Sequence, residues 1–116
     1  MSRRKYYTTK HDVYRVYDEN RTLLYVGCSI NGFERIKQHK HERQFWWKYA
    51  CTVDILQYPD KTTARGVEAK AIAEEHPIWN IAKEHSALTR LRGTTPEPID
   101  AMTNLPINDF FDRVAA

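Results

Sequence analysis

Two short apolar stretches separated by a polar segment constrain the fold of this chain most strongly. Residues 12–17 and 22–27 are rich in β-branched and aromatic side chains, which favours strands. This pattern predicts a β-hairpin with its turn at residues 19–20. In that register the numbers of paired residues add to 39, so Tyr14 lies opposite Tyr25 on one face of the hairpin. A shift of one residue would place the two tyrosines on opposite faces.

The next segment predicts a helix and a third strand. Asn31 is a favourable N-cap for a helix that runs to about residue 42 or 43. The aromatic connector 44–50 follows, and we expect it mainly to close the hydrophobic core, although its rings could also stack on unpaired bases. Residues 51–58 alternate well enough for a strand.

A second helix is expected over about residues 62–75, with Asp60 or Thr62 as its cap and Pro77 at its end. The resulting order, β-β-α-β-α, predicts a single small α/β (α+β) domain. We expect a three-stranded antiparallel sheet flanked by helices, followed by a C-terminal extension.

Charge and composition divide the chain into three parts. Residues 1–11 read as a basic N-terminal arm, residues 12–92 as the folded domain, and residues 93–116 as an acidic tail with a short helix near 108–114. The first 48 residues carry 11 Lys or Arg but only 5 Asp or Glu, whereas the rest of the chain carries 7 and 10. A basic surface around the hairpin suggests a phosphate-bearing partner, most simply nucleic acid, and an ordinary solvated face is the equally weighted alternative.

The sequence favours a cytoplasmic protein without a membrane anchor. No apolar run approaches the roughly 20 residues that span a bilayer, and the basic N-terminus leads into no apolar stretch. The two cysteines, Cys28 and Cys51, do not form a disulfide framework, which favours reduced thiols.

The first predicted helix carries a candidate phosphate-binding group. Arg35 and His39 lie one turn apart on one face, whereas Phe33 and Ile36 lie on another side and can pack against the sheet. A guanidinium matches two phosphate oxygens, and a histidine can act as a general base near neutral pH. Five further basic side chains are expected to contact the substrate: Arg15, Lys37, Lys40, His41 and Arg43.

Glu68 is the candidate metal ligand. It lies in the middle of the second helix among small and apolar residues, where a carboxylate requires a hydrogen bond, a cation or a metal ion as a partner. Mg²⁺ is often held by only one or two carboxylates together with water and substrate phosphates. The simpler interpretation is a residue at the helix rim that pairs with Lys61, Lys70 or solvent.

Over residues 12–82 the chain resembles the GIY-YIG nuclease family. Five features in the order of the family carry the resemblance: Asp12-Val13-Tyr14, Tyr25-Val26-Gly27, Arg35 with His39, Glu68, and Asn80 in Trp79-Asn80-Ile81-Ala82. One departure is Asp12, which stands where the family has its first glycine. We expect this change to affect the packing of the first strand rather than the activity.

The resemblance implies an endonuclease or nickase that hydrolyses DNA phosphodiester bonds with one Mg²⁺ or Mn²⁺ ion. It implies that Glu68 holds the metal, that Arg35 offsets the developing negative charge, and that Tyr25 positions water or phosphate. Tyr14 is the family's usual candidate for the base, and His39 competes with it because its ordinary pKa is about 6.5. Gly27 and Asn80 are expected to be structural residues near the site.

Two other functions stay open. The chain could be a nucleic-acid-binding module with little or no catalysis, or a nuclease that depends on a protein partner for target choice. No recognisable DNA-reading module accompanies the matching region, so sequence specificity has no obvious location. We expect a monomer or weak dimer that acts on single-stranded, duplex or branched DNA.

Overall fold

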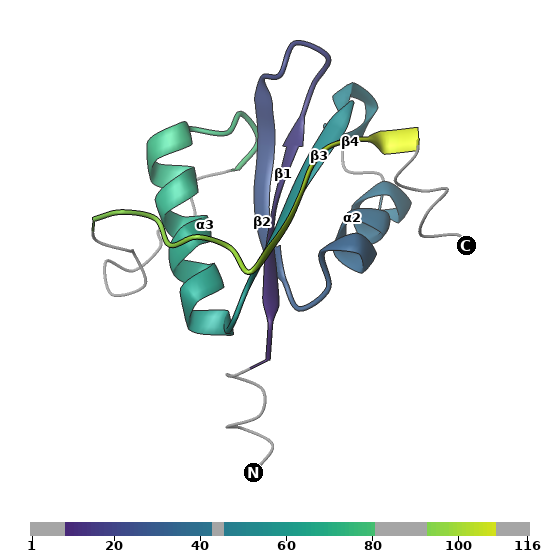
Figure 1. Cartoon of the computed structure of the whole chain (residues 1–116). Coiled ribbons are helices and arrows are strands. Elements are labelled where there is room, and N and C mark those ends of the chain that lie inside the picture. Colours follow the sequence, from purple (N-terminus) through teal and green to yellow (C-terminus); the bar gives the residue numbers. More distant parts are fainter. Residues whose placement is uncertain (1–8, 43–45, 81–92, 109–116) are drawn as a thin grey trace.

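In the computed structural model, which describes residues 9–42, 46–80 and 93–108, a four-stranded antiparallel sheet lies between two helices (Figure 1). The strands follow the spatial order β2-β1-β3-β4, so β2 and β4 form the edges. The elements in chain order are β1 (His11–Tyr17), β2 (Leu23–Ser29), α2 (Gly32–His41), the short 3₁₀ helix η1 (Trp47–Tyr49), β3 (Thr52–Tyr58), α3 (Lys61–Glu75) and β4 (Asp100–Pro106). Within these ranges, no helix is long and apolar enough to cross a bilayer.

The expected α/β class is confirmed, but the number of strands is not three. The fourth strand, β4, comes from the segment that composition assigned to an acidic tail, and it pairs with β3. The strand was not predicted because the segment is rich in prolines and acidic residues. Its Met102 and Leu105 side chains are half-buried. A bulge opposite Asp54 holds it in place, since the Asp54 carboxylate accepts a 2.8 Å hydrogen bond from the backbone N–H of Asn104, a residue with φ of 55°. Apart from Asn108, the helix expected over 108–114 lies outside the described residues.

The predicted hairpin forms, but its register differs from the expected one. Tyr14 pairs with Gly27, and Tyr25 pairs with Val16. The connecting loop is one residue longer than expected, because the N–H of Asp18 donates to the Thr22 carbonyl.

A β-bulge adds a second shift to this register. Val16 pairs with Tyr25 while Tyr17 pairs with Leu23, so Leu24 is the extra residue. Two shifts of one residue in the same direction restore the original face. Tyr14 and Tyr25 therefore share a face as diagonal neighbours, with ring centroids 6.2 Å apart, rather than as a directly opposed pair.

Both helices begin at the caps that the sequence predicts. The side chain of Asn31 accepts a hydrogen bond from the N–H of Glu34, and that of Asp60 accepts one from the N–H of Thr63. At the other end of α3, His76 adopts a left-handed conformation with φ of 50°, directly before Pro77. The ends of α2 and α3 are thus fixed by local chemistry.

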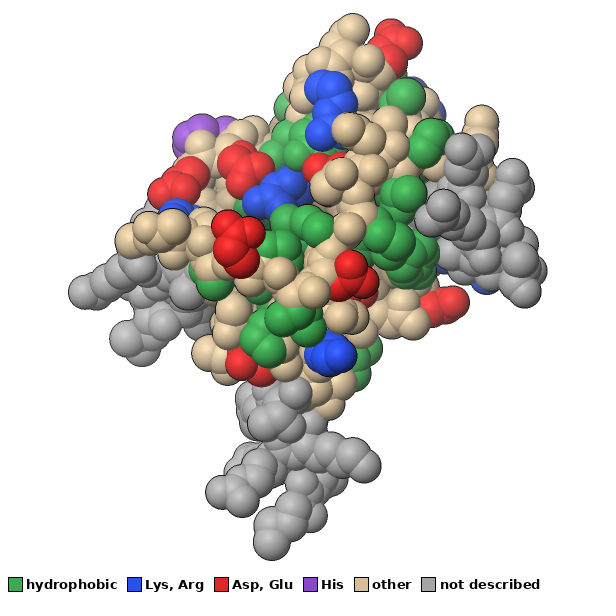
Figure 2. Space-filling model, in the orientation of Figure 1, with side chains coloured by type: hydrophobic (Ala, Val, Ile, Leu, Met, Phe, Trp, Pro, Cys, Tyr) green, Lys and Arg blue, Asp and Glu red, His purple; other side chains and the backbone are tan. Residues whose placement is uncertain are grey.

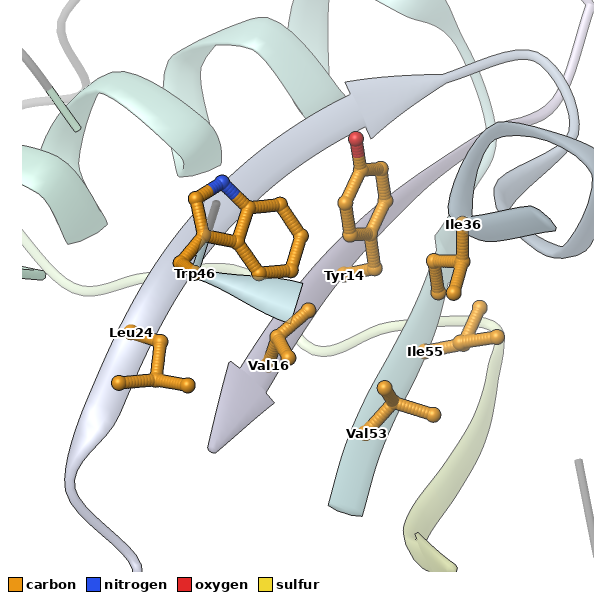
Figure 3. Packing of buried hydrophobic residues seen from close by; sticks show 7 residues of the cluster. All are labelled: Tyr14, Val16, Leu24, Ile36, Trp46, Val53 and Ile55. Atoms are coloured by element: carbon orange, nitrogen blue, oxygen red, sulfur yellow. The ribbon is translucent and has the colours of Figure 1, made fainter. Parts of the chain in front are cut away.

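Separate hydrophobic clusters fill the two faces of the sheet. The face that α3 covers holds Val13, Val26 and Tyr58 from the sheet together with Val67 from the helix. The opposite face, which α2 covers, holds the cluster drawn in Figure 3: Tyr14, Val16, Leu24, Ile36, Trp46, Val53 and Ile55. The tyrosine of the first predicted motif is thus embedded in the core on the α2 side.

Candidate active site

A buried hydrogen bond joins two of the predicted catalytic residues. The hydroxyl oxygen of Tyr14 on β1 lies 2.7 Å from Nε2 of His39 on α2. Both side chains are almost fully buried, with exposed fractions of 1% and 2%. Helix α2 makes the contact because His39 lies one turn from Ile36 on its buried face, and not with Arg35 on a face away from Ile36 as predicted. The two residues expected as alternative bases are therefore directly connected.

Burial keeps both members of this pair uncharged near neutral pH. Desolvation raises the pKa of Tyr14 well above its ordinary value of 10.0, and the nearby Tyr25 raises it further. Desolvation and then the positive charge of Arg35 lower the pKa of His39 to about 4. A neutral phenol and a neutral imidazole can form the hydrogen bond with either group as the donor.

The second nitrogen of His39 is a buried polar atom without a hydrogen-bond partner among the described residues. This atom is Nδ1, and it carries the proton of the neutral ring whenever Nε2 accepts a hydrogen bond from Tyr14. Unpaired polar atoms of this kind are rare in protein interiors because they retain much of their desolvation penalty. Such an arrangement fits a functional histidine better than one that serves only to fill the core.

Two mutually stacked aromatic rings contact the His39 imidazole. The ring of Tyr25 lies edge-on to it at 5.1 Å, and the ring of Trp46 does so at 5.2 Å. Trp46 also stacks on Tyr25, with centroids 5.0 Å apart and planes 13° apart. The expected role of the connector in closing the core is confirmed for Trp46, which is 3% exposed. Its contact with His39 was not predicted, since it depends on how the connector folds back over β2.

Arg35 lies at the edge of this cluster with its side chain about one-third exposed. Its Nη1 donates a 2.7 Å hydrogen bond to Oε1 of Gln38 and lies 3.4 Å from Oε1 of Glu42. Its positive charge lowers the pKa of Tyr14, Tyr25 and His39, so it acts on all three rings of the site. The partner carboxylate of Glu42 was not identified from the sequence, although its position seven residues along the same helix is a usable signal.

Glu68 approaches the site from the other side of the sheet. Desolvation is the main reason that the pKa of Tyr25 is raised, and the negative charge of Glu68 is the second. The same charge also raises the pKa of Tyr14 and of Cys28. Tyr25 belongs to the α2 side of the sheet, whereas Cys28 packs on the α3 side. A carboxylate can influence both sides because α3 packs beside β2, which is an edge strand.

The donor set fits a hydrated metal ion rather than a closed metal cage. Among the residues that the structure describes, no three His, Cys, Asp or Glu side chains gather into a metal-binding group. Glu68 is a half-buried carboxylate, and Mg²⁺ is often held by only one or two carboxylates together with waters and substrate phosphates.

The predicted substrate-binding residues do not all lie together. Lys37 and His41 line a surface depression together with Arg35, whereas the exposed Lys40 is not part of its lining. Arg43 lies outside the described residues.

Arg15, which was predicted to contact substrate, pairs with a carboxylate of α3 in the structure. Its side chain is only 13% exposed, and it forms two hydrogen bonds of 2.9 and 2.8 Å with the Glu75 carboxylate. It alternates with Tyr14 along β1 and therefore joins the strand to α3, away from the α2 side. Burial and this paired carboxylate give Arg15 a structural role.

Asp12, the departure from the family pattern, anchors the start of α2. Its carboxylate accepts a 2.8 Å hydrogen bond from the N–H of Gly32, the first residue of the helix. Desolvation by burial nevertheless raises the pKa of this carboxyl. Asp12 pairs regularly with Ser29 and Gln57, so β1 is regular at this position.

Asn80 ties the segment after α3 to the edge of the sheet. Its side-chain oxygen accepts a 2.8 Å hydrogen bond from the N–H of Val26, and its nitrogen donates a 2.9 Å bond to the carbonyl of the same residue. The N–H groups of Ile78 and Trp79 add bonds to the carbonyls of Leu23 and Leu24. These contacts hold β2, and with it Tyr25, in a fixed position.

Gly27 leaves room for the Tyr14 ring. A methyl group at this position would overlap Cζ and the hydroxyl oxygen of Tyr14 and would lie 2.7 Å from Cε2. The ring crosses directly over the glycine because the two residues are cross-strand partners. The requirement for glycine therefore comes from the close approach of a side chain, which the sequence pattern alone does not reveal.

Replacing Gly27 with alanine is expected to lower the free energy of unfolding by about 2–3 kcal/mol, because the buried Tyr14 ring must move out of its place. Urea denaturation followed by circular dichroism measures the change. Gly93→Ala is the control for backbone strain alone, since an alanine is strained at its φ of 82° but nothing lies within 4 Å of the added methyl group. Equal unfolding midpoints for Gly27→Ala and the unmodified protein would contradict the packing described above.

Comparisons of the chain with protein-family models, curated proteins and solved structures gave no match.

Proposed function

We propose that the chain is a metal-dependent endonuclease or nickase of the GIY-YIG type that hydrolyses DNA phosphodiester bonds. The observation that carries the proposal is the buried 2.7 Å contact between the Tyr14 hydroxyl and Nε2 of His39, beside Tyr25 and Arg35. A chance match of short motifs does not require these residues to meet. Their convergence at one place, within the electrostatic reach of Glu68, supports a shared chemical task.

Arg35 binds the scissile phosphate in this proposal. Its present ion pair with Glu42 is long and half-exposed, and pairs of this kind contribute only about 0–1 kcal/mol. A phosphate can therefore replace Glu42 and accept two parallel hydrogen bonds from the guanidinium. The same contact offsets the negative charge that accumulates in the transition state.

Tyr14 and His39 act in series as the base. The attacking water gives a proton to the Tyr14 oxygen as Tyr14 gives its own proton to Nε2 of His39, so no free phenolate has to form. The oxygen of the water bonds to phosphorus and the bond to the 3′-oxygen breaks, leaving a 5′-phosphate and a 3′-hydroxyl that takes its proton from solvent. The negative phosphate makes His39 a stronger base than it is in the free protein.

Glu68 is the residue that would hold Mg²⁺ or Mn²⁺. When bound, the ion stabilises the negative charge on the leaving oxygen. Glu68 itself adds negative potential around Tyr14 and Tyr25, which disfavours phenolate formation and agrees with a relay through neutral groups.

The basic α2 side is the proposed DNA face. Figure 2 views the molecule from the side on which β4 lies, where hydrophobic and acidic side chains are interspersed with few basic ones. That composition is unfavourable for binding a phosphate backbone. We also infer a cytoplasmic location, which fits the free thiols of Cys28 and Cys51, and a monomer or weak dimer that obtains target choice from a partner.

Metal-dependent cleavage is the test of this function. Purified protein is incubated with labelled single-stranded, duplex and branched DNA in the presence of Mg²⁺, Mn²⁺ or EDTA. Cleavage that requires the metal is the expected result. Salt-sensitive binding without cleavage of any substrate would instead support a nucleic-acid-binding module.

A further inference from the structure

A surface depression of about 480 Å³ lies on the outer side of α2, next to the proposed active site. Its wall is mostly apolar, and its lining includes Ser29 at the end of β2, Ile30 and Asn31 from the loop that follows, and Arg35, Lys37 and His41 from α2. A volume of this size falls within the range of small-ligand sites. Arg35 belongs to both the rim and the proposed active site, so the two are continuous.

Ile30 is the apolar group that a ligand would meet first. Its side chain is 54% exposed and lines the depression, so its apolar surface is accessible to a ligand there. The loop that carries it is held on both sides, because Ser29 Oγ donates to the Asn31 carbonyl and accepts from the Asn31 N–H, both at 3.1 Å. Asn31 in turn caps α2. The fold thus presents Ile30 on a fixed support.

The charges at the depression suit a phosphate-bearing ligand. Arg35 and Lys37 are basic residues of the lining, and Glu34 is its acidic residue. The combination of an apolar wall with cations at the rim matches a nucleotide, whose base is apolar on its faces and whose phosphates are anionic.

We propose that this depression receives one unpaired nucleotide of the DNA strand, adjacent to the phosphate that Arg35 binds. The inference rests on the proposed function and narrows its substrate to DNA with an unpaired base beside the cleavage point. In a continuous duplex the base faces are stacked inside the helix and cannot reach an apolar wall. A base in a single strand, flap or bubble has its face free and can pack on Ile30.

Binding without metal tests this inference separately from catalysis. Fluorescence anisotropy in EDTA compares three DNA probes: a continuous duplex, the same duplex with one unpaired nucleotide, and a single strand. We expect the unmodified protein to prefer the two probes with unpaired bases. Ile30→Ala is expected to weaken binding to those two probes about fivefold and to leave duplex binding unchanged.

Ile78→Ala is the matched control, because Ile78 is also 54% exposed but lies outside the lining of the depression. It is expected to bind all three probes like the unmodified protein. The inference is overturned if Ile30→Ala keeps the full preference or loses affinity equally for all probes, as a site for duplex backbone would. If the preference depends on Ile30 but no probe is ever cleaved with metal, the inference stands as a binding site and only the proposed nuclease function fails.

Discussion

Glu68→Gln is expected to abolish metal-dependent cleavage while the fold stays intact. The substitution keeps the size of the side chain but removes the negative charge that would hold the metal ion. Loss of the ion's charge stabilisation amounts to several kcal/mol, or about a thousandfold or more in rate. Single-turnover cleavage with Mg²⁺ measures the loss, and thermal unfolding confirms that the variant folds.

Glu68→Gln should not weaken DNA binding, although it abolishes cleavage. In EDTA, Glu68→Gln should bind DNA at least as tightly as the unmodified protein, because it removes a negative charge near the phosphate site. Glu74→Gln is the matched control, since Glu74 is an exposed residue of the same helix, and it should cleave normally. Full cleavage by Glu68→Gln would exclude Glu68 as the metal ligand.

Tyr14→Phe and His39→Gln are each expected to reduce the cleavage rate by about a hundredfold to a thousandfold. Phenylalanine lacks the hydroxyl that passes the proton on, and glutamine keeps a hydrogen-bond acceptor but cannot take up a proton. Because the two residues act in series, the double variant should be little worse than either single variant. If either variant cleaves at the normal rate, its residue is not part of the proton path.

The pH dependence of cleavage provides a second measurement of this relay. His39 must be neutral to accept a proton, and in the free protein burial and Arg35 lower its pKa to about 4. The ratio kcat/KM reports the free enzyme, so it should stay high as the pH falls below 6.5 and should decline only near pH 4. A decline centred near the ordinary histidine pKa of about 6.5 would contradict a buried, neutral His39.

The sequence predicted the hairpin and the shared face of its two tyrosines, but not its register. The predicted register, in which the numbers of paired residues add to 39, placed Tyr14 directly opposite Tyr25. That register was wrong, since the loop and the bulge at Leu24 each add one residue. The two tyrosines still share a face, as diagonal neighbours, because two shifts of one residue equal the side-chain period of a strand.

Other features depend on tertiary packing that local patterns do not encode. The strand β4 was missed because its stability comes from backbone pairing with β3 and from Asp54, which lies far away in the sequence. The helix caps at Asn31 and Asp60 were predictable because capping is a local interaction. In the site, the residue types were predicted individually, but the bond between Tyr14 and His39 exists only because α2 packs across β1.

Cleavage of DNA in ¹⁸O-labelled water, with Mg²⁺ and with EDTA, tests the central claim most directly. Mass spectrometry of the products identifies the chemistry of both new ends and the source of the added oxygen. Direct attack by water predicts cleavage only with the metal, one ¹⁸O atom in a new 5′-phosphate and an unlabelled 3′-hydroxyl. Products with 3′-phosphate ends, cleavage that persists in EDTA, or intact DNA under every condition would contradict it.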